Sequence, residues 1–371
     1  LTEASRFLDE MVAQQVVAGA VGAVARQGRL AYVHATGVQD LQTGVPMSAS
    51  SIFRIYSMTK SVTAVAAMML WEDGRFTLDD AVSKYLPEFS RVVVQAADGP
   101  RAPTRPITVQ DLLLHTSGLN HRTSPEYRNA GVRSRSIALP QFVANIVKVP
   151  LMEDPGTRYR YSEATTVLGR LVEVWSGRSF ERFLDDEIFT PLRMPDTTFS
   201  VPFAERRRLT TVYAPAEGGG RGLRAVEIEE VPFTVVPALR EGAVGLLSTV
   251  PDYLRFSQML LNRGTLDGAT LLKPETVDLM IANRLSPAIT ASRGGVMGWG
   301  LANVNVVLDP SRVPYPASVG EYGWDGTAGT IFWIDPGKQM ITLLMTQITP
   351  ANPQQLRQRF KTLVEQAVRP R

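Results

Sequence analysis

The sequence reads Ser57-Met58-Thr59-Lys60 at the start of an apolar segment that runs to Trp71. Lys60 is one of only six lysines among 39 basic residues, and the only one with a serine three positions before it. Arginine keeps its proton in proteins, whereas a lysine amine shielded from water can become neutral and act as a base. Chance alone supplies about 0.4 such matches in this chain, so the motif needs support from the rest of the sequence.

The segment from Ser57 to Trp71 is rich in Ala, Met, Val and Leu on all sides, which predicts a helix buried around most of its circumference. In the first turn, the Ser57 hydroxyl would lie near the positive end of the helix dipole, with Lys60 on the same face. A neutral lysine within hydrogen-bond reach can activate a serine nucleophile. The structural alternative is that Ser57 is only an N-cap and that Lys60 faces solvent. The motif alone leaves both interpretations open.

Outward from this helix, strands are predicted near both ends of the chain and helices between them. Two apolar runs, 19–26 and 30–35, indicate a hairpin about Gly28, and strands are predicted at 330–334 and 340–346. Helices are predicted at 2–16, 110–115, 140–147, 164–175, 180–189 and 353–368, and residues 77–80 have the form of a capping box that opens another. We therefore expect an α/β fold: an antiparallel sheet with flanking helices from residues 1–75 and 241–371, and an inserted, mostly helical domain at 76–240.

Composition narrows the function. With 44% hydrophobic and 20% charged residues, the chain has the balance of an ordinary globular protein, and no membrane span is expected. The net charge of +3 comes from scattered arginines, and the run Arg206-Arg207-Arg208 is interpreted as a solvated helix face, so no nucleic-acid partner is expected. The first residues lack the basic and apolar regions of a signal peptide, and the chain does not begin with Met. The compartment, cytoplasmic or exported, and the oligomeric state are not predicted.

The sequence also limits the chemistry. It contains no cysteine, which excludes thiol nucleophiles and disulfides. The three histidines, His34, His115 and His121, show no metal-ligand spacing. We expect no metal and no organic cofactor.

Two further segments support a serine nucleophile. Tyr161 stands just before the predicted helix 164–175, where a phenol close to an ammonium can exchange protons with nucleophile and leaving group. The segment from Gly323 to Trp333 crowds small residues at the start of a strand, which permits close approach of a backbone N–H to a ligand. Paired with the N–H of Ser57, such a donor would form an oxyanion hole. The structural alternatives are an amphipathic tyrosine that covers a helix end and a bulged strand with packing glycines.

These motifs resemble, in order along most of the chain, those of the serine β-lactamase and penicillin-binding protein superfamily, in its class C-like branch. Ser57 to Lys60 fits the nucleophile motif, Tyr161-Ser162-Glu163 the tyrosine motif, and Trp324-Asp325-Gly326 stands where the family has Lys-Thr-Gly or His-Thr-Gly. Supporting matches are Leu112 to Leu119, Pro191 to Thr197 and Gly245 to Thr249. The resemblance marks His115, within the first of these supporting matches, as a structural histidine. A Ser-His-Asp triad is also disfavoured because the chain has no G-x-S-x-G elbow.

The chain departs from the family pattern at two motifs. Trp324 and Asp325 replace the residues that hold a substrate carboxylate in lactam-processing members, so affinity for such a carboxylate should fall. Glu163 replaces an asparagine; because a carboxylate near Lys60 would favour the ammonium, we expect Glu163 to point away or to pair elsewhere. A third motif with tryptophan and Gly326, without the asparagine, resembles the family VIII carboxylesterases.

The sequence therefore predicts a serine carboxylesterase that hydrolyses small acyl esters through an acyl-enzyme. The predicted catalytic residues are Ser57, Lys60 and Tyr161, with the N–H groups of Ser57 and Thr327 as the oxyanion hole. Trp324, Asp325, Gly326, Tyr127 and Trp333 are the candidate substrate-binding residues. The alternatives are a β-lactamase or D-amino-acid peptidase, an acyltransferase, and a binding protein on an inactive β-lactamase fold.

Overall fold

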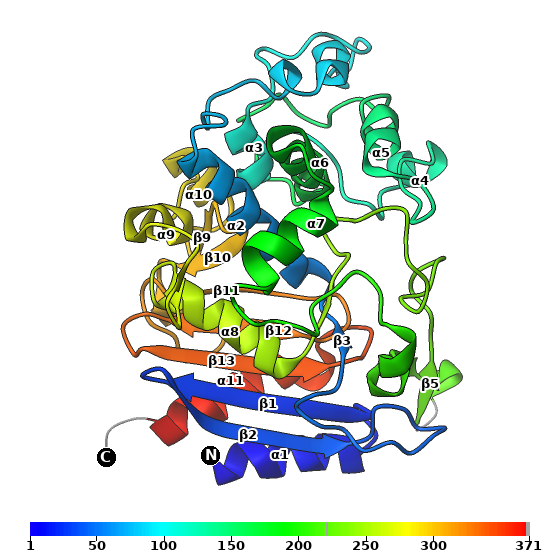
Figure 1. Ribbon diagram of the computed structural model, residues 1–371, viewed down its shortest axis with the longest axis vertical. Coiled ribbons are helices and arrows are strands. Elements are labelled where there is room, and N and C mark those ends of the chain that lie inside the picture. The colour runs from blue at the N-terminus through cyan, green and yellow to red at the C-terminus, as the bar shows by residue number, and fades with distance from the viewer. Residues whose placement is uncertain (220–221, 369–371) are drawn as a thin grey trace.

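The computed structural model of the protein describes residues 1–219 and 222–368. A seven-stranded sheet in the order β2-β1-β13-β12-β11-β10-β9 forms its base, and every neighbouring pair in that sheet is antiparallel (Figure 1). The strands are β1 (Gly19–Arg26), β2 (Arg29–Gly37), β9 (Met297–Gly300), β10 (Val304–Val307), β11 (Tyr322–Asp325), β12 (Ile331–Asp335) and β13 (Met340–Thr346). Both ends of the chain supply this sheet, which confirms the predicted fold class.

Two terminal helices, α1 (Thr2–Ala13) and α11 (Leu356–Val368), cover one face of the sheet (Figure 1). Their apolar sides share a core layer with β13, which includes Leu8 of α1, Phe360 of α11 and Leu344. Gly22 lies opposite Leu344 in the register of β1 and β13, and a Cβ there would stand 2.6 Å from the Phe360 ring. The glycine therefore lets α11 pack directly on the sheet.

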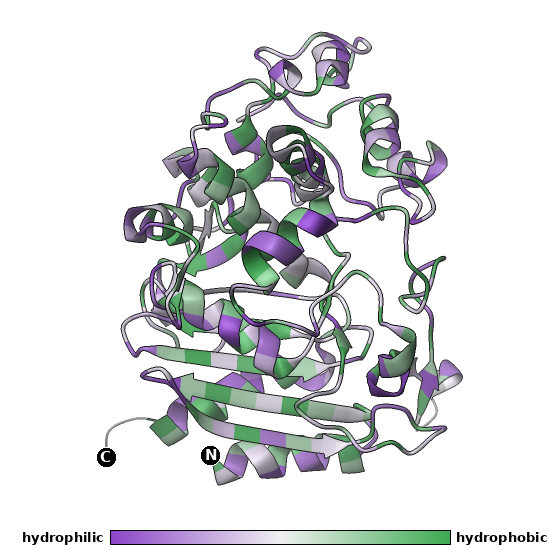
Figure 2. Cartoon of the chain, viewed as in Figure 1, coloured by the Kyte–Doolittle hydropathy of each residue, from purple (hydrophilic) through white to green (hydrophobic). Residues whose placement is uncertain are grey.

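The helices on the other face form a second and larger core. They are α2 (Thr59–Glu72), α3 (Val109–Leu114), α4 (Pro125–Asn129), α5 (Leu139–Ile146), α6 (Ala164–Ser176), α7 (Phe180–Leu184), α8 (Val250–Leu261), α9 (Pro274–Ile281) and α10 (Pro287–Ser292). Eleven of the fourteen residues of α2 are buried, as its uniformly apolar sequence predicts. Figure 2 shows green, hydrophobic ribbon along β1 and β13 and on several helices of this side. Among the described residues, none of the helices has the length and apolarity of a bilayer span.

The helix predicted after the capping-box motif is not formed. Asp80 accepts a hydrogen bond from the Thr77 N–H at 2.8 Å, but the same carboxylate oxygen accepts from the Tyr85 hydroxyl at 2.6 Å. Ala81 is extended and bridges to Thr108, so the chain passes into a single 3-10 turn at Val82–Lys84 instead of an α-helix. The Thr77–Asp80 hydrogen bond therefore stabilises a loop and not the start of an α-helix.

The other named strands of the described residues are short and pair in twos: β3 (Phe53–Arg54) with β6 (Leu247–Ser248), β4 (Tyr213–Pro215) with β5 (Leu223–Ala225), and β7 (Thr265–Leu266) with β8 (Ala269–Thr270). The pairing of β3 with β6 ties the segment just before Ser57 to the segment just before α8. The residue limits given for the inserted helical domain stay a prediction.

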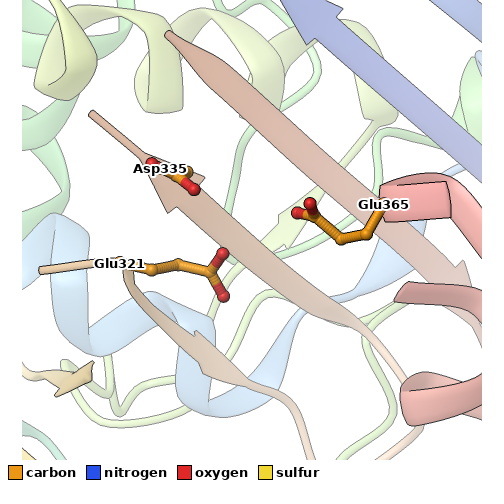
Figure 3. Close-up of side chains that lie close together, drawn as sticks. All are labelled: Glu321, Asp335 and Glu365. Carbon is orange, nitrogen blue, oxygen red and sulfur yellow. The ribbon is translucent and has the colours of Figure 1, made fainter. Parts of the chain in front are cut away.

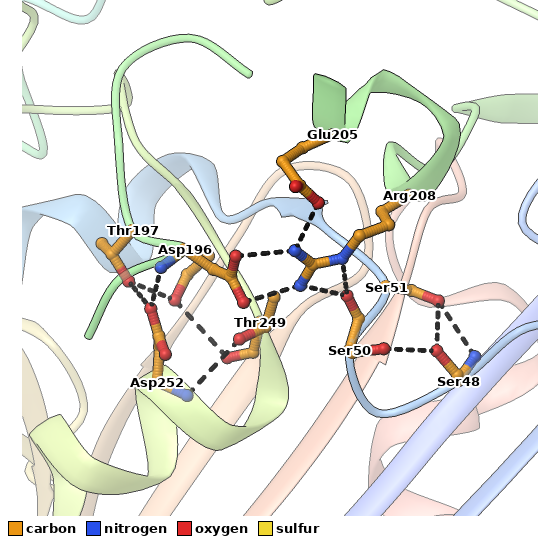
Figure 4. Close-up of polar contacts among 10 residues, drawn as sticks. Ser48, Ser50, Ser51, Asp196, Thr197, Glu205, Arg208, Thr249 and Asp252 are labelled. Atoms are coloured by element: carbon orange, nitrogen blue, oxygen red, sulfur yellow. Dashed lines mark hydrogen bonds and ion pairs between the residues drawn. The ribbon is translucent and has the colours of Figure 1, made fainter. Parts of the chain in front are cut away.

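A polar network secures the segment that leads to Ser57 (Figure 4). Arg208, in the 3-10 helix Phe203–Arg208, donates to both oxygens of Asp196 at 2.8 and 2.6 Å and to the carbonyl of Ser50. The Asp252 carboxylate near the start of α8 accepts from the Asp196 N–H at 2.8 Å and from the Thr197 hydroxyl at 2.9 Å. Arg208 of the arginine run is thus committed to internal ion pairs.

A second network joins α11 to the sheet. Three buried carboxylates, Glu321, Asp335 and Glu365, lie with one oxygen of each within 4.8 Å of the others (Figure 3). Lys361 donates to Glu321 at 2.9 Å and to Glu365 at 2.8 Å, and Lys338 bridges Asp335 and Glu365 at 3.1 and 2.7 Å. The ammonium groups of Lys338 and Lys361 thus form ion pairs with all three carboxylates. Burial raises the pKa of Glu321 to about 7 in spite of Lys361.

Candidate active site

Ser57 lies in a short 3-10 helix, η1 (Tyr56–Met58), that continues directly into α2. The sequence predicts Ser57 in the first turn of an α-helix, whereas the structure has this tighter turn. Tyr56 has φ of 41°, in the left-handed region that residues other than glycine rarely adopt, and its side chain is fully buried. Packing around Tyr56 therefore holds the backbone that presents Ser57.

Lys60 follows one turn later and is only 1% exposed, so the alternative of a solvent-facing lysine is wrong. Its ammonium nitrogen donates to the carbonyl of Ala243 at 2.9 Å and lies 4.6 Å from the centroid of the Tyr161 ring. Burial lowers the pKa of Lys60 to about 8, because the interior disfavours the charged form. A substantial fraction of the amine is therefore neutral near pH 8.

Tyr161 joins this pair from the loop that precedes α6. The indole N–H of Trp324, on β11, donates to the Tyr161 hydroxyl at 3.0 Å. Burial raises the pKa of Tyr161, and hydrogen bonds with Ser57 and Trp324 oppose part of that rise. The structure thus brings Ser57, Lys60, Tyr161 and Trp324 together from the start of α2, the α6 loop and the sheet.

Aromatic side chains surround Tyr161 and keep it in place. The ring of His115 lies 4.8 Å from that of Tyr161, and its Nδ1 accepts from the Ser162 N–H at 3.3 Å. Burial holds the pKa of His115 well below its usual value, so this histidine is neutral and structural, as the sequence indicates.

Sequence reasoning missed two members of this group. His121 stacks on the Tyr161 ring with centroids 5.8 Å apart, and burial together with Lys60 lowers the pKa of His121 to about 4. Trp299, from β9, packs edge-on against Trp324 with centroids 4.7 Å apart. Neither residue belongs to a motif, and the sequence carries no periodicity that could have placed them here.

The turn after β11 lies against the backbone just before Ser57. A Cβ on Gly326 would stand 2.6 Å from the carbonyl oxygen of Ile55, and the Thr330 hydroxyl donates to that oxygen at 3.4 Å. Thr327 is the exposed residue of this turn. The small residues of this segment therefore allow the turn to pack directly against the backbone that precedes Ser57.

Three of the candidate substrate-binding residues lie elsewhere. Side chains alternate along a strand, so Asp325 faces away from Trp324 and pairs with Arg357 of α11. Trp333, opposite Gly323 in register, packs in the layer beneath α1 and α11. Tyr127 is buried in the helical core, where its hydroxyl accepts from the Asn120 N–H at 2.8 Å. We correct these three assignments to structural positions; Trp324 and Gly326 remain at the site.

Glu163 is the buried residue just before α6. It is 1% exposed, its carboxylate accepts from the Thr166 hydroxyl at 2.9 Å, and its negative charge is the main influence that raises the pKa of Lys60 against the effect of burial. The hydrogen bond with Thr166 is the pairing elsewhere that the sequence analysis expects. The Glu163 charge nevertheless still favours the protonated form of Lys60.

Nearly the whole chain matches known proteins. The family described as Beta-lactamase matches residues 4–365. The chain belongs to the beta-lactamase family. Among similar proteins of this family, Protein Rv1367c of Mycobacterium tuberculosis (strain ATCC 25618 / H37Rv) is 35% identical over 356 residues, which cover 90% of this chain and 87% of that protein. Esterase EstB of Burkholderia gladioli is 29% identical over 362 residues, which cover 91% and 88%.

A solved structure agrees with the same assignment. The structure of "EstCE1, a hydrolase with promiscuous acyltransferase activity" superposes with a TM-score of 0.86 at 25% identity, and the match covers 99% of this chain and 97% of that one. As a member of the beta-lactamase family with esterases among its relatives, the chain is a serine hydrolase on a β-lactamase fold.

Proposed function

We propose that this serine hydrolase is a carboxylesterase that hydrolyses small acyl esters through an acyl-enzyme. The observation that carries the proposal is the contact of Trp324 with Tyr161 at 3.0 Å. By its resemblance to the family motif, Trp324 stands in the sequence where lactam-processing members have a cation or hydroxyl for a substrate carboxylate, and the one donor of its indole is bonded to Tyr161. Uncharged acyl esters are then favoured over lactam or peptide substrates that carry a carboxylate. The likeness to Esterase EstB supports this choice.

In the proposed reaction, Ser57 Oγ attacks the ester carbonyl while neutral Lys60 accepts the hydroxyl proton. The N–H groups of Ser57 and Thr327 stabilise the tetrahedral oxyanion. The carbon–oxygen bond to the alcohol then breaks, and the alcohol leaves with a proton from Lys60 by way of Tyr161. Water attacks the acyl-enzyme with the same two residues as base, which releases the carboxylic acid. Because Lys60 and Tyr161 are in contact, they should titrate as a coupled pair.

A comparison of two chromogenic substrates tests the specificity. We expect kcat/KM for a short p-nitrophenyl ester to exceed that for a chromogenic cephalosporin by about 100-fold or more, since one lost ion pair to a carboxylate is worth a few kcal/mol. Ser57→Ala serves as the control and should abolish both reactions. Faster turnover of the cephalosporin would overturn the proposed specificity while leaving the nucleophile in place.

Acyl transfer is a second candidate, because the similar protein EstCE1 is a hydrolase with promiscuous acyltransferase activity. The same acyl-enzyme would pass its acyl group to an alcohol instead of water. Chromatographic analysis of products formed from a p-nitrophenyl ester in the presence of added butanol distinguishes the two. A butyl ester that forms with the wild type and not with Ser57→Ala supports transfer, whereas carboxylic acid as the sole product opposes it.

A further inference from the structure

The acceptor of the Lys60 hydrogen bond belongs to a segment, residues 241–246, that is tied to α2 at three points. Lys60 Nζ donates to the Ala243 carbonyl at 2.9 Å, the Thr63 hydroxyl donates to the Gly242 carbonyl at 2.7 Å, and the Leu246 N–H donates to the Thr59 hydroxyl at 3.1 Å. A neutral amine that donates one N–H to Ala243 has its lone pair directed away from that carbonyl. The position of the Ala243 carbonyl therefore sets the direction in which Lys60 can accept a proton.

A buried ion pair fixes the start of this segment. Both oxygens of Glu241, which is 1% exposed, accept from Arg133, at 2.5 Å from Nε and 2.6 Å from Nη2. The carbonyl of Glu241 also accepts from the Gly245 N–H at 2.8 Å, which closes the turn that contains Ala243. Bidentate arginine–carboxylate contacts have a defined planar geometry. Arg133 thus holds the turn from outside α2.

Arg133 belongs to a larger group, which we call the charge cluster: Arg122, Arg133, Glu163, Glu229 and Glu241. Arg133 also donates to Glu229 at 2.7 Å, and Arg122 donates to Glu229 at 3.0 Å. Glu230 also lies 3.8 Å from Arg133, and the buried Arg135 interacts through its charge with Glu229 and Glu241. Glu163 and Glu241 raise the pKa of Lys60, and Arg122 lowers it.

The other titratable groups around Lys60 are either neutral or ion-paired. His115 and His121 have lowered pKa values and are neutral, and Asp325 is paired with Arg357. Tyr161 has a raised pKa and is neutral as well. Glu163, Glu241 and Arg122 of the charge cluster are thus, together with Asp325, the charges that act on the Lys60 amine.

We propose that the charge cluster positions Lys60 for catalysis: the Arg133–Glu241 ion pair fixes the Ala243 carbonyl that orients the amine, and Arg122 limits the negative field of the glutamates there. The inference rests on the proposed role of Lys60 as the base. These residues do not touch the reacting atoms, so they are positioning residues. A purely structural cluster would join the loops of the helical part without any effect on the titration of Lys60.

The test is the rate at which a fluorophosphonate labels Ser57, measured from about pH 5.5 to about pH 10 so that the titration of Lys60 is covered. In this reaction the Oγ–phosphorus bond forms, fluoride leaves, and the serine proton passes to Lys60. We expect Glu241→Gln to lower the maximal labelling rate by about 10-fold or more and to move the midpoint to lower pH. Arg122→Gln should move the midpoint to higher pH. Glu241→Asp keeps the negative charge, but its shorter side chain cannot reach Arg133 in the same geometry. This variant should slow labelling with little change in the midpoint of its pH dependence.

Glu321→Gln is the matched control, because Glu321 is equally buried and ion-paired but lies on the other face of the sheet. It should change the melting temperature without changing the rate or midpoint of labelling. Midpoints in Glu241→Gln and Arg122→Gln that equal the wild-type value, with melting temperatures lowered as in the control, would overturn the inference. If Arg122→Gln does not fold, the pair Glu241→Gln and Glu241→Asp decides, since only the first should move the midpoint. A wild type that takes up no label would instead overturn the proposed nucleophile, and the inference with it.

Discussion

At the scale of single residues, Lys60, one of only six lysines in the chain, differs from an ordinary lysine because it is buried. Lys60 is buried because α2 is apolar on nearly every side, and the cost of burying its charge brings its pKa to about 8. The burial of this helix was predictable from its apolar sequence, whereas the motif left open whether Lys60 faces solvent. The acceptor of the Lys60 hydrogen bond could not be predicted, because Ala243 is 183 positions away and carries no motif.

The first prediction concerns the pH dependence of acylation. Only neutral Lys60 can accept the Ser57 proton, so the acylation rate should rise with pH and reach half of its maximum near the Lys60 pKa of about 8. Lys60→Arg should slow acylation by about 10³-fold, because the guanidinium keeps its proton. Stopped-flow release of p-nitrophenol measures both. A rate independent of pH between about 6 and about 9 would contradict Lys60 as the base.

The second prediction concerns Trp324. Trp324→Phe keeps an aromatic ring but removes the N–H that donates to Tyr161, so the pKa of Tyr161 should rise further and proton transfer should slow. We expect kcat to fall by about 10-fold, equivalent to the loss of one hydrogen bond, with little change in KM. Steady-state kinetics with a p-nitrophenyl ester measure it. A larger KM with unchanged kcat would show that Trp324 only binds substrate.

At the scale of secondary-structure elements, the hydrophobic pattern of the sequence predicted where strands lie, but it did not predict how those strands pair. The β-branched and apolar runs predicted both β12 and β13. Asp325 and Trp333 were predicted to bind substrate, yet they lie on the face of the sheet that α1 and α11 cover. The face of a residue depends on register, and register is set by pairing with strands distant in sequence. The helix predicted to begin after residues 77–80 is absent for a similar reason: Ala81 pairs with Thr108, which is distant in sequence, and this pairing prevents a helix.

The third prediction tests the segment that carries Ala243. A Cβ on Gly242 would stand 2.6 Å from the carbonyl oxygen of Thr165, so Gly242→Ala should lower the free energy of unfolding by about 1–3 kcal/mol. It should also slow acylation, since the neighbouring Ala243 carbonyl must shift. Gly169→Ala is the control: it lies inside a helix, and its Cβ would meet the Phe180 ring at 3.4 Å and the Gly242 Cα at 3.7 Å, both ordinary contacts. Urea titration of both variants should show a loss of stability in Gly242→Ala alone.

At the scale of the whole molecule, the sheet built from both ends of the chain was predictable because strand signals occur near both termini. The networks that hold its layers together were not. The carboxylates of Glu321, Asp335 and Glu365 come from two strand ends and a helix, and no sequence pattern indicates that Lys338 and Lys361 meet them. The charge cluster at the site was missed for the same reason: ion pairs between distant segments leave no local pattern.

The fourth prediction uses the network of Figure 3. The pKa of Glu321 is raised to about 7 in the folded protein, so the folded state binds this proton more tightly than the unfolded state. Its contribution to stability is therefore complete below the ordinary glutamate pKa of 4.5 and is lost as the pH rises through about 7. The free energy of unfolding of the wild type relative to Glu321→Gln should fall over that range by about 3 kcal/mol. Chemical denaturation at several pH values measures this difference, and a constant difference would contradict it.

The assignment of Ser57 as the nucleophile of a serine hydrolase is tested most directly by covalent labelling. The wild type and Ser57→Ala are treated with a fluorophosphonate, digested, and analysed by mass spectrometry of the labelled peptide. We expect a single label on the peptide that contains Ser57 in the wild type, and no label in Ser57→Ala. Label that persists in Ser57→Ala would show that another residue is the nucleophile.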